Sequence, residues 1–160
     1  MANRGKQAVK KDGPYLTAAF FCERTIEDKQ DGALSAIRII DIITLTLPAS
    51  APPEIPSETH RLPVHISGLL SFKTGGSPGE HTVRLVMHSP SGKSQTVLEQ
   101  VLPFSPEPYG GANLRVDSVV LVKKGGLFWM HVFLDGKRVT RIPLVISIQR
   151  AEGAASGPAD

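Results

Sequence analysis

The sequence has little cysteine and no long hydrophobic run, and each shortage excludes something. Cys22 is the single cysteine of the 160 residues, so an intramolecular disulfide is excluded and a reducing compartment is favoured. No stretch of about 20 apolar residues is present, and the N-terminal "MANRGKQAVKKDGP" is basic without the apolar segment of a signal peptide. We therefore expect a cytoplasmic protein with no membrane partner.

Motifs that carry chemistry are also missing. The sequence contains no G-x-S-x-G, and the glycine-rich "TGGSPGE" and "YGGAN" do not lead from a strand into a helix, as a phosphate-binding loop requires. Cys22 lies in the apolar "TAAFFCE", where a buried and inert thiol is expected. The five histidines have no metal-ligand spacing and no second cysteine to help: His60, His65, His81, His88 and His131. We expect no catalytic residues, no metal and no cofactor, and a protein that is not an enzyme.

The net charge of +3 rests largely on one end of the chain. Residues 1–12 carry +3 and residues 151–160 carry −2, so by subtraction residues 13–150 carry only +2. Both ends lack the apolar side chains that would offset the entropy lost on ordering. The sequence therefore predicts a disordered basic tail at 1–12, one folded domain at 13–150 and a disordered tail at 151–160.

Between the tails, short apolar runs alternate with turn signals, which favours an all-β fold. We expect eight strands, at 15–23, 34–47, 61–72, 80–88, 94–102, 112–122, 126–135 and 138–149. Asp135-Gly136 between two apolar runs predicts a type I′ hairpin. Pro143 cannot donate to a strand ladder, so the last strand is expected at an edge or to be bulged there. Strands with one apolar face pack as two sheets, so we expect a single antiparallel β-sandwich, with a barrel as the alternative.

The segment "PASAPPEIPSETHRLP" at 48–63 holds five prolines and is too stiff for a helix or a central strand. We interpret it as an extended crossover between strands that covers part of a sheet. A docking motif for a proline-reading domain is the less favoured alternative.

Three stretches together carry a resemblance: "AFFCERTIEDKQDGALSAIRIIDIITLTLP", "GEHTVRLVMHSPSGK" and "GGLFWMHVFLDGKRVTRIPL". Over about residues 15–148 the chain resembles a family of small bacterial proteins with an immunoglobulin-like β-sandwich domain of unknown function. The shared motifs are turn and core signatures. The resemblance implies the fold and brings no catalytic residues with it.

Asp41 interrupts the apolar "AIRIIDIITL", and an unpaired buried carboxylate is costly. Three interpretations remain open. A bulge turns Asp41 to solvent, which we favour, or Asp41 pairs with Arg38 or another cation, or it is an acid in a pocket.

The strand at 126–135 has large apolar side chains on both faces. Its even residues form an unbroken apolar set that we assign to the core: Phe128, Met130, Val132 and Leu134. Its odd residues then face outward: Leu127, Trp129, His131 and Phe133. The two aromatic rings offer roughly 150–250 Å² of contact area each, and with Leu127 they approach the size of a partner-binding patch. The crossover, a second copy, another protein or a small ligand are the candidates to cover this stripe.

The leading hypothesis is thus a non-enzymatic binding or assembly module that contacts itself or another protein through Leu127, Trp129, His131 and Phe133. The alternative is a small-molecule or enzymatic pocket around Asp41, Trp129 and His131. Nucleic acid is not an expected partner, because basic residues lie at opposite ends of the strands and no aromatics alternate with them along the sequence.

Overall fold

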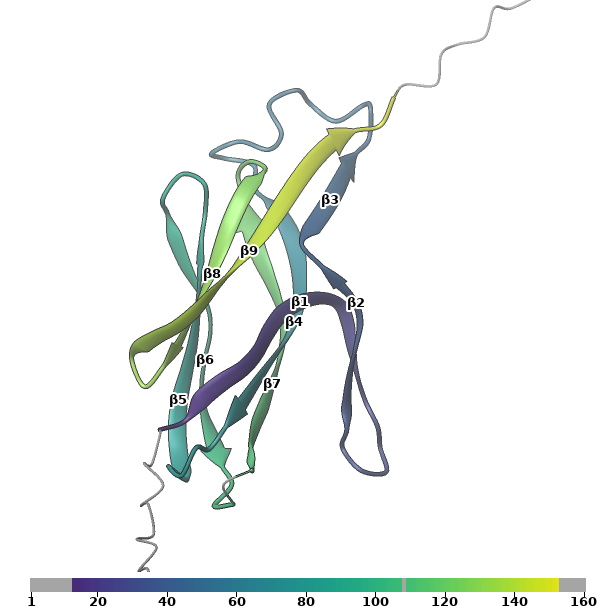
Figure 1. Cartoon of the computed structure of the whole chain (residues 1–160). Helices are drawn as coiled ribbons and strands as arrows, with labels where there is room; N and C mark the ends of the chain where they lie inside the picture. Colours follow the sequence, from purple (N-terminus) through teal and green to yellow (C-terminus); the bar gives the residue numbers. More distant parts are fainter. Residues whose placement is uncertain (1–12, 108, 153–160) are drawn as a thin grey trace, which may run out of the picture.

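The computed structural model describes residues 13–107 and 109–152, and its regular structure is strand (Figure 1). The predicted tails lie outside these residues, except for 151–152. The nine strands are β1 (Tyr15–Glu27), β2 (Leu34–Ile40), β3 (Ile42–Leu47), β4 (Leu62–Lys73), β5 (Gly79–His88), β6 (Ser94–Phe104), β7 (Gly111–Val122), β8 (Gly126–Leu134) and β9 (Lys137–Arg150).

The strands form two sheets that pack face to face. One sheet has the order β2-β1-β4-β7 and the other the order β3-β9-β8-β5-β6 (Figure 1). Alternate residues of both sheets point inward and build one core, whose fully buried members include Phe72, Leu85 and Ile146. The expected sandwich is therefore confirmed, and the barrel alternative is wrong.

The strand order is that of an immunoglobulin-like sandwich. Strands β9, β8, β5 and β6 are neighbours in one sheet, while β4 and β7 are neighbours in the other, as in immunoglobulin domains. Pairing is antiparallel except between β3 and β9, which run parallel. In the first sheet, β1 lies between β2 and β4 and pairs with both.

The segment 34–47, expected as one strand, is two strands that belong to different sheets. The chain leaves the first sheet after Ile40 and enters the second at Ile42, so the expectation of eight strands is corrected to nine. Asp41 lies at this switch with its side chain exposed, while its carbonyl accepts a 2.8 Å hydrogen bond from the Val145 amide. Asp41 therefore faces solvent as favoured, but a change of sheet causes this rather than a bulge.

The β8–β9 hairpin forms as predicted from Asp135-Gly136. Both residues have positive φ, 48° and 78°, which a type I′ turn requires. The even residues of β8 are buried in the core, as expected. Strand β9 lies between β3 and β8, but β3 pairs with it only from Val145 onward, so Pro143 occupies a part of β9 whose second edge is open in the described chain.

Cys22 is buried as expected, 1% exposed, with its Sγ 3.9 Å from the Ser67 hydroxyl. It lies where β1 pairs with both β2 and β4. An ion pair of 3.2 Å between Arg115 of β7 and Glu27 links the end of the β1–β2 hairpin to the far strand of the same sheet.

The proline-rich crossover from β3 to β4 runs across one end of the sandwich (Figure 1). The Arg150 guanidinium, at the end of β9, donates to the carbonyls of Ala51 and Pro52 at 2.6 and 2.7 Å and to that of Ile55 at 3.1 Å. Glu58 contacts Lys123 of the β7–β8 turn. These contacts hold the crossover at the strand ends.

Candidate functional site

The odd residues of β8 lie on the outer face of their sheet, as the alternation predicts. Leu127 is exposed, while Trp129, His131 and Phe133 are half-buried. The neighbouring strands explain this partial burial, because the strand register sets basic side chains of β5 and β9 beside the aromatic ones. We call this surface the β8 face, defined by Leu127, Trp129, His131 and Phe133 of β8 with Arg84, His88, Arg138 and Arg141.

Two guanidinium groups cover the two aromatic rings. The Arg141 guanidinium carbon lies 4.4 Å from the centre of the Trp129 ring, and that of Arg84 lies 4.7 Å from the centre of the Phe133 ring. Both distances are within the reach of a cation–π interaction. Within the described residues, arginines of the same sheet therefore cover the rings of Trp129 and Phe133. The crossover, one of the expected covers, makes its polar contacts at the strand ends instead.

The centre of the β8 face is electropositive. The rings of His88 and His131 lie with their centres 4.1 Å apart, between the two arginine–aromatic pairs. Partial burial lowers the pKa of His131, and the positive charges of His88, Arg138 and Arg141 lower it further. One carboxylate, that of Glu99 on β6, belongs to a residue directly opposite Arg84 in the strand register.

A small apolar cluster adjoins the basic part of the β8 face. Ile42, Val145 and Leu127 are aligned across β3, β9 and β8, and they are 57, 36 and 43% exposed. Sequence reasoning singled out Leu127 but not the cluster. Val145 is opposite Leu127 in the β8–β9 hairpin and so had a sequence signal, whereas Ile42 had none, because the parallel pairing of β3 with β9 has no local cause.

Asp41, Trp129 and His131, the residues of the alternative pocket, line neither of the two hollows described below. Asp41 lies at the start of the edge strand β3, whereas the two rings lie on β8, with β9 in between.

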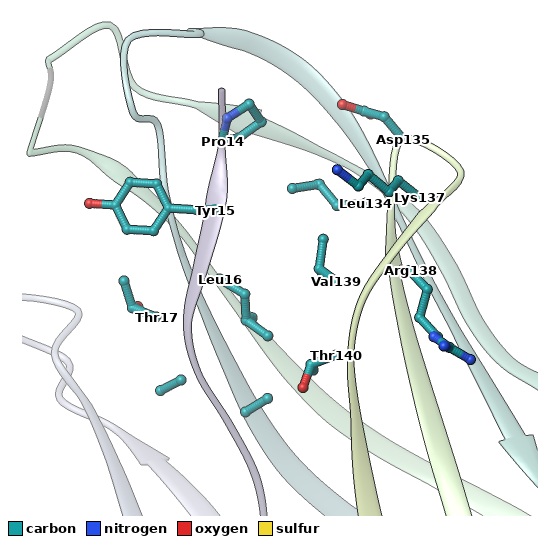
Figure 2. A pocket seen from close by; sticks show the side chains of 12 residues that line it. Pro14, Tyr15, Leu16, Thr17, Leu134, Asp135, Lys137, Arg138, Val139 and Thr140 are labelled. Atoms are coloured by element: carbon teal, nitrogen blue, oxygen red, sulfur yellow. The ribbon is translucent and has the colours of Figure 1, made fainter. Parts of the chain in front are cut away.

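The larger hollow is an open groove of about 800 Å³ between the first halves of β1 and β9 (Figure 2). Leu16 of β1 and Val139 of β9 point into it from the two sheets, and Lys137 and Arg138 lie along one side (Figure 2). Among the described residues, β2 pairs with β1 only from Phe21 onward, so this part of β1 has an open edge. The groove offers apolar contact and strand edges.

The carboxylate nearest this groove is engaged elsewhere. Asp135 accepts from His81 at 2.7 Å and from the Thr82 amide at 2.9 Å. Burial alone would lower the pKa of His81, but the Asp135 carboxylate and the Ser77 carbonyl outweigh it, so the pKa is raised. The hydrogen bonds from His81 and Thr82 lower the pKa of Asp135 in spite of its burial. This pair fastens β5 to the β8–β9 turn.

A second histidine–aspartate pair lies in the other sheet. His65 is exposed and pairs with Asp117 at 2.5 Å across β4 and β7. Within residues 13–107 and 109–152, no three His, Cys, Asp or Glu side chains are grouped to hold a metal ion. No helix in the same part of the chain is long and apolar enough to cross a membrane.

The basic half of the β8 face is what sequence reasoning missed. No arginine lies within β8 itself. The neighbouring strands bring arginines beside its aromatic side chains, because Arg84 of β5 is opposite Phe133 and Arg141 of β9 is opposite His131. The Asp135-Gly136 hairpin fixes the pairing of β8 with β9 to within one bulge, so Arg141 had a sequence signal. Arg84 had none, because β5 and β8 are separated by two further strands along the chain.

Comparison with known proteins identifies no family. No family model matches the chain, and no curated protein matches it. Among solved structures, an immunoglobulin-like protein from Pseudomonas aeruginosa aligns at 11% identity and a TM-score of 0.39, covering 86% of this chain and 98% of the other.

Two larger proteins also align in part. The alkylpurine DNA glycosylase AlkC of Pseudomonas fluorescens, bound to DNA with an abasic site analogue, is 11% identical at a TM-score of 0.40, over 84% of this chain and 30% of the glycosylase. A β-glucosidase from Listeria innocua in complex with glucose is 8% identical at a TM-score of 0.38, over 56% of this chain and 14% of the glucosidase. At these scores the likenesses say nothing about what this chain binds.

Proposed function

We propose that the protein is a non-enzymatic binding module whose β8 face docks an acidic surface of another protein. The observation that carries the proposal is the pair of guanidinium groups stacked on Trp129 and Phe133. A stacked guanidinium keeps its N–H edge free, and that edge matches a carboxylate with two parallel hydrogen bonds. Neither Arg84 nor Arg141 forms an ion pair within the described residues.

The composition of the β8 face supports a protein partner. Tryptophan, phenylalanine and arginine are enriched where protein interfaces concentrate their binding energy. The cluster of Ile42, Leu127 and Val145 adds exposed apolar area beside the basic groups. A nucleic acid would need open ring faces for its bases, and on this surface the guanidinium groups already occupy the faces of Trp129 and Phe133.

A second copy of the chain is a poorer occupant of the same surface. In a two-fold interface the same patch meets itself, so Arg84 and Arg141 of one copy would lie near those of the other. Like charges brought together at an interface cost several kcal/mol. We therefore propose a different, acidic chain as the partner.

Charge reversal tests this proposal. The double variant Arg84→Glu/Arg141→Glu inverts the β8 face, and the control Arg24→Glu/Lys29→Glu inverts two exposed basic side chains of β1 and the β1–β2 turn, in the opposite sheet, with the same change in net charge. Immobilised wild type and control are expected to retain the same protein from lysate, in a salt-sensitive manner, while the β8 variant loses it. Nuclease treatment should leave the capture unchanged.

Three outcomes would overturn the proposal. Capture that the β8 variant retains would place the contact elsewhere on the molecule. Capture abolished by nuclease would mean that the charge attracts nucleic acid. A wild-type dimer in light scattering that the β8 variant lacks would make the chain its own partner.

A further inference from the structure

A second hollow lies at the end of the sandwich where the crossover runs, on the core side of β5 and β8. Residues of the β5–β6 turn and of the β7–β8 turn line it, together with Arg61, which precedes β4. Figure 1 shows the two turns at this end of the sandwich. Its volume is about 370 Å³, which is at the small end of the range for ligand sites. The two turns close one side, because Gly126 packs so near Pro90 that a Cβ on Gly126 would lie 2.8 Å from the proline ring.

The floor of this hollow is the hydrophobic core itself. Met87, Val120, Val122 and Phe128 line it, and each is at most 4% exposed. These side chains come from both sheets, so the hollow is the mouth of the space between them. An apolar group that entered would contact core side chains directly and gain the free energy of leaving water.

The rim of the hollow is basic. Its charged lining residues are Arg61, Lys93, Lys123 and Lys124. The Lys123 side chain is 21% exposed, so its ammonium group is partly removed from water and gains more from a negative partner than a surface lysine does.

A carboxylate from the crossover already lies on two of these lysines. Glu58 contacts Lys123 and lies 3.8 Å from Lys93. Glu58 is itself 75% exposed, so water can replace the lysines as its partner at little cost. The Glu58 carboxylate thus lies on two lysines that line the hollow. Within the described residues, Glu58 forms ion pairs only with these two lysines.

We propose that this hollow binds a small apolar molecule with one carboxylate. Its hydrocarbon part would lie against Met87 and Phe128, and its carboxylate would take the place of Glu58 on Lys93 and Lys123. Glu58 then acts as a built-in competitor that the ligand displaces. The size of the hollow limits the hydrocarbon part to a short alkyl chain or a single ring.

Octanoate is the probe that tests the proposal, with octylammonium and 1-octanol as controls of equal chain length. Met87 and Met130 are the methionines of the described chain, and only Met87 lines the hollow. With 13C-labelled methionine methyl groups, octanoate is expected to shift the Met87 signal in a saturable way. Octanol should bind about tenfold more weakly, because it lacks the charge-assisted hydrogen bonds.

Two variants separate this site from a general affinity for fatty acids. Lys123→Met keeps the aliphatic stem and removes the charge, so the affinity for octanoate is expected to fall about tenfold. Glu58→Gln removes the competitor and should raise that affinity roughly threefold or more. Lys137→Met, at the other end of the sandwich, is the matched control and should leave the affinity unchanged.

The proposal is wrong if octanoate and octanol bind equally, since the basic rim would then contribute nothing. It is also wrong if Glu58→Gln leaves the affinity for octanoate unaltered, or if the Met87 signal does not saturate. The Met130 signal of ligand-free Lys123→Met shows whether the core of this variant is intact, because Met130 is buried. If that signal differs from the wild type, the result with Glu58→Gln decides, because this substitution alters only an exposed side chain.

Discussion

The stacking of Arg141 on Trp129 should stabilise the domain measurably, because a guanidinium group 4.4 Å from the ring centre lies well inside cation–π range. Trp129 is half-buried and Arg141 is exposed, so the interaction belongs between the values for exposed and desolvated pairs. We expect a coupling free energy of about 0.5–1 kcal/mol. For a domain of this size, that corresponds to a shift of roughly 1–4 °C in the melting temperature.

A double-mutant cycle measures this coupling free energy. Arg141→Met removes the guanidinium group but keeps most of the stem, and Trp129→Val removes the ring but keeps the preference for a strand. Urea unfolding of the wild type, both single variants and the double variant gives the coupling as the departure from additivity. The slope against urea concentration should be the same for all four proteins.

The control cycle pairs Trp129→Val with Arg24→Met, because Arg24 is on β1 in the opposite sheet. Those two changes should add to within about 0.3–0.5 kcal/mol. A coupling between Arg141 and Trp129 no larger than that of the control would refute the stacking, and with it the idea that Arg141 is held in place for a carboxylate.

Three further predictions concern the fold. Gly136 has φ +78° with open space around its missing Cβ, so Gly136→Ala should cost about 1 kcal/mol in urea unfolding through backbone strain alone, and Gly136→Asn should cost less. The raised pKa of His81 means that its bond to Asp135 stabilises the fold fully below the ordinary histidine pKa of about 6.5 and is lost as pH rises through the higher folded value. The unfolding free energy should thus fall with pH above about 6.5 in the wild type and less steeply in His81→Gln, and parallel curves would show that the bond is not formed. Cys22 should react with a thiol reagent only at the rate of unfolding, and rapid stoichiometric labelling of the native protein would contradict its burial.

Local features of this fold could be predicted from the sequence because each has a local cause. The period-two alternation of β8 assigns Phe128 to the core without knowledge of what lies above it. Asp135-Gly136 specifies the turn through the positive φ that both residues adopt. The carboxylate of Asp41 correctly indicated that this residue faces solvent, but the same signal fits a bulge and a change of sheet equally well.

Features that depend on which strands are neighbours could not be predicted. The partners of β8 are β9, which the hairpin fixes, and β5, which arrives after two intervening strands in the chain. Arg84 reaches Phe133 only because β5 occupies that place in the sheet. Basic residues that are far apart in the sequence therefore lie on one face. The expectation that basic residues lie at opposite ends of the strands did not take Arg84 into account.

The covering of Trp129 and Phe133 also answers why β8 has large side chains on both faces. A bare aromatic stripe on an open sheet would invite nonspecific association, whereas a guanidinium group over each ring removes apolar area from water and leaves a charge at the surface. A partner with carboxylates can bind the outer edge of each guanidinium without displacing it from the ring. The neighbouring Leu127 has no such cover and remains 43% exposed, so apolar contact is concentrated at one end of the β8 face and charge at the other. A partner that matches both ends in order would be bound in a single orientation, which neither end alone would impose.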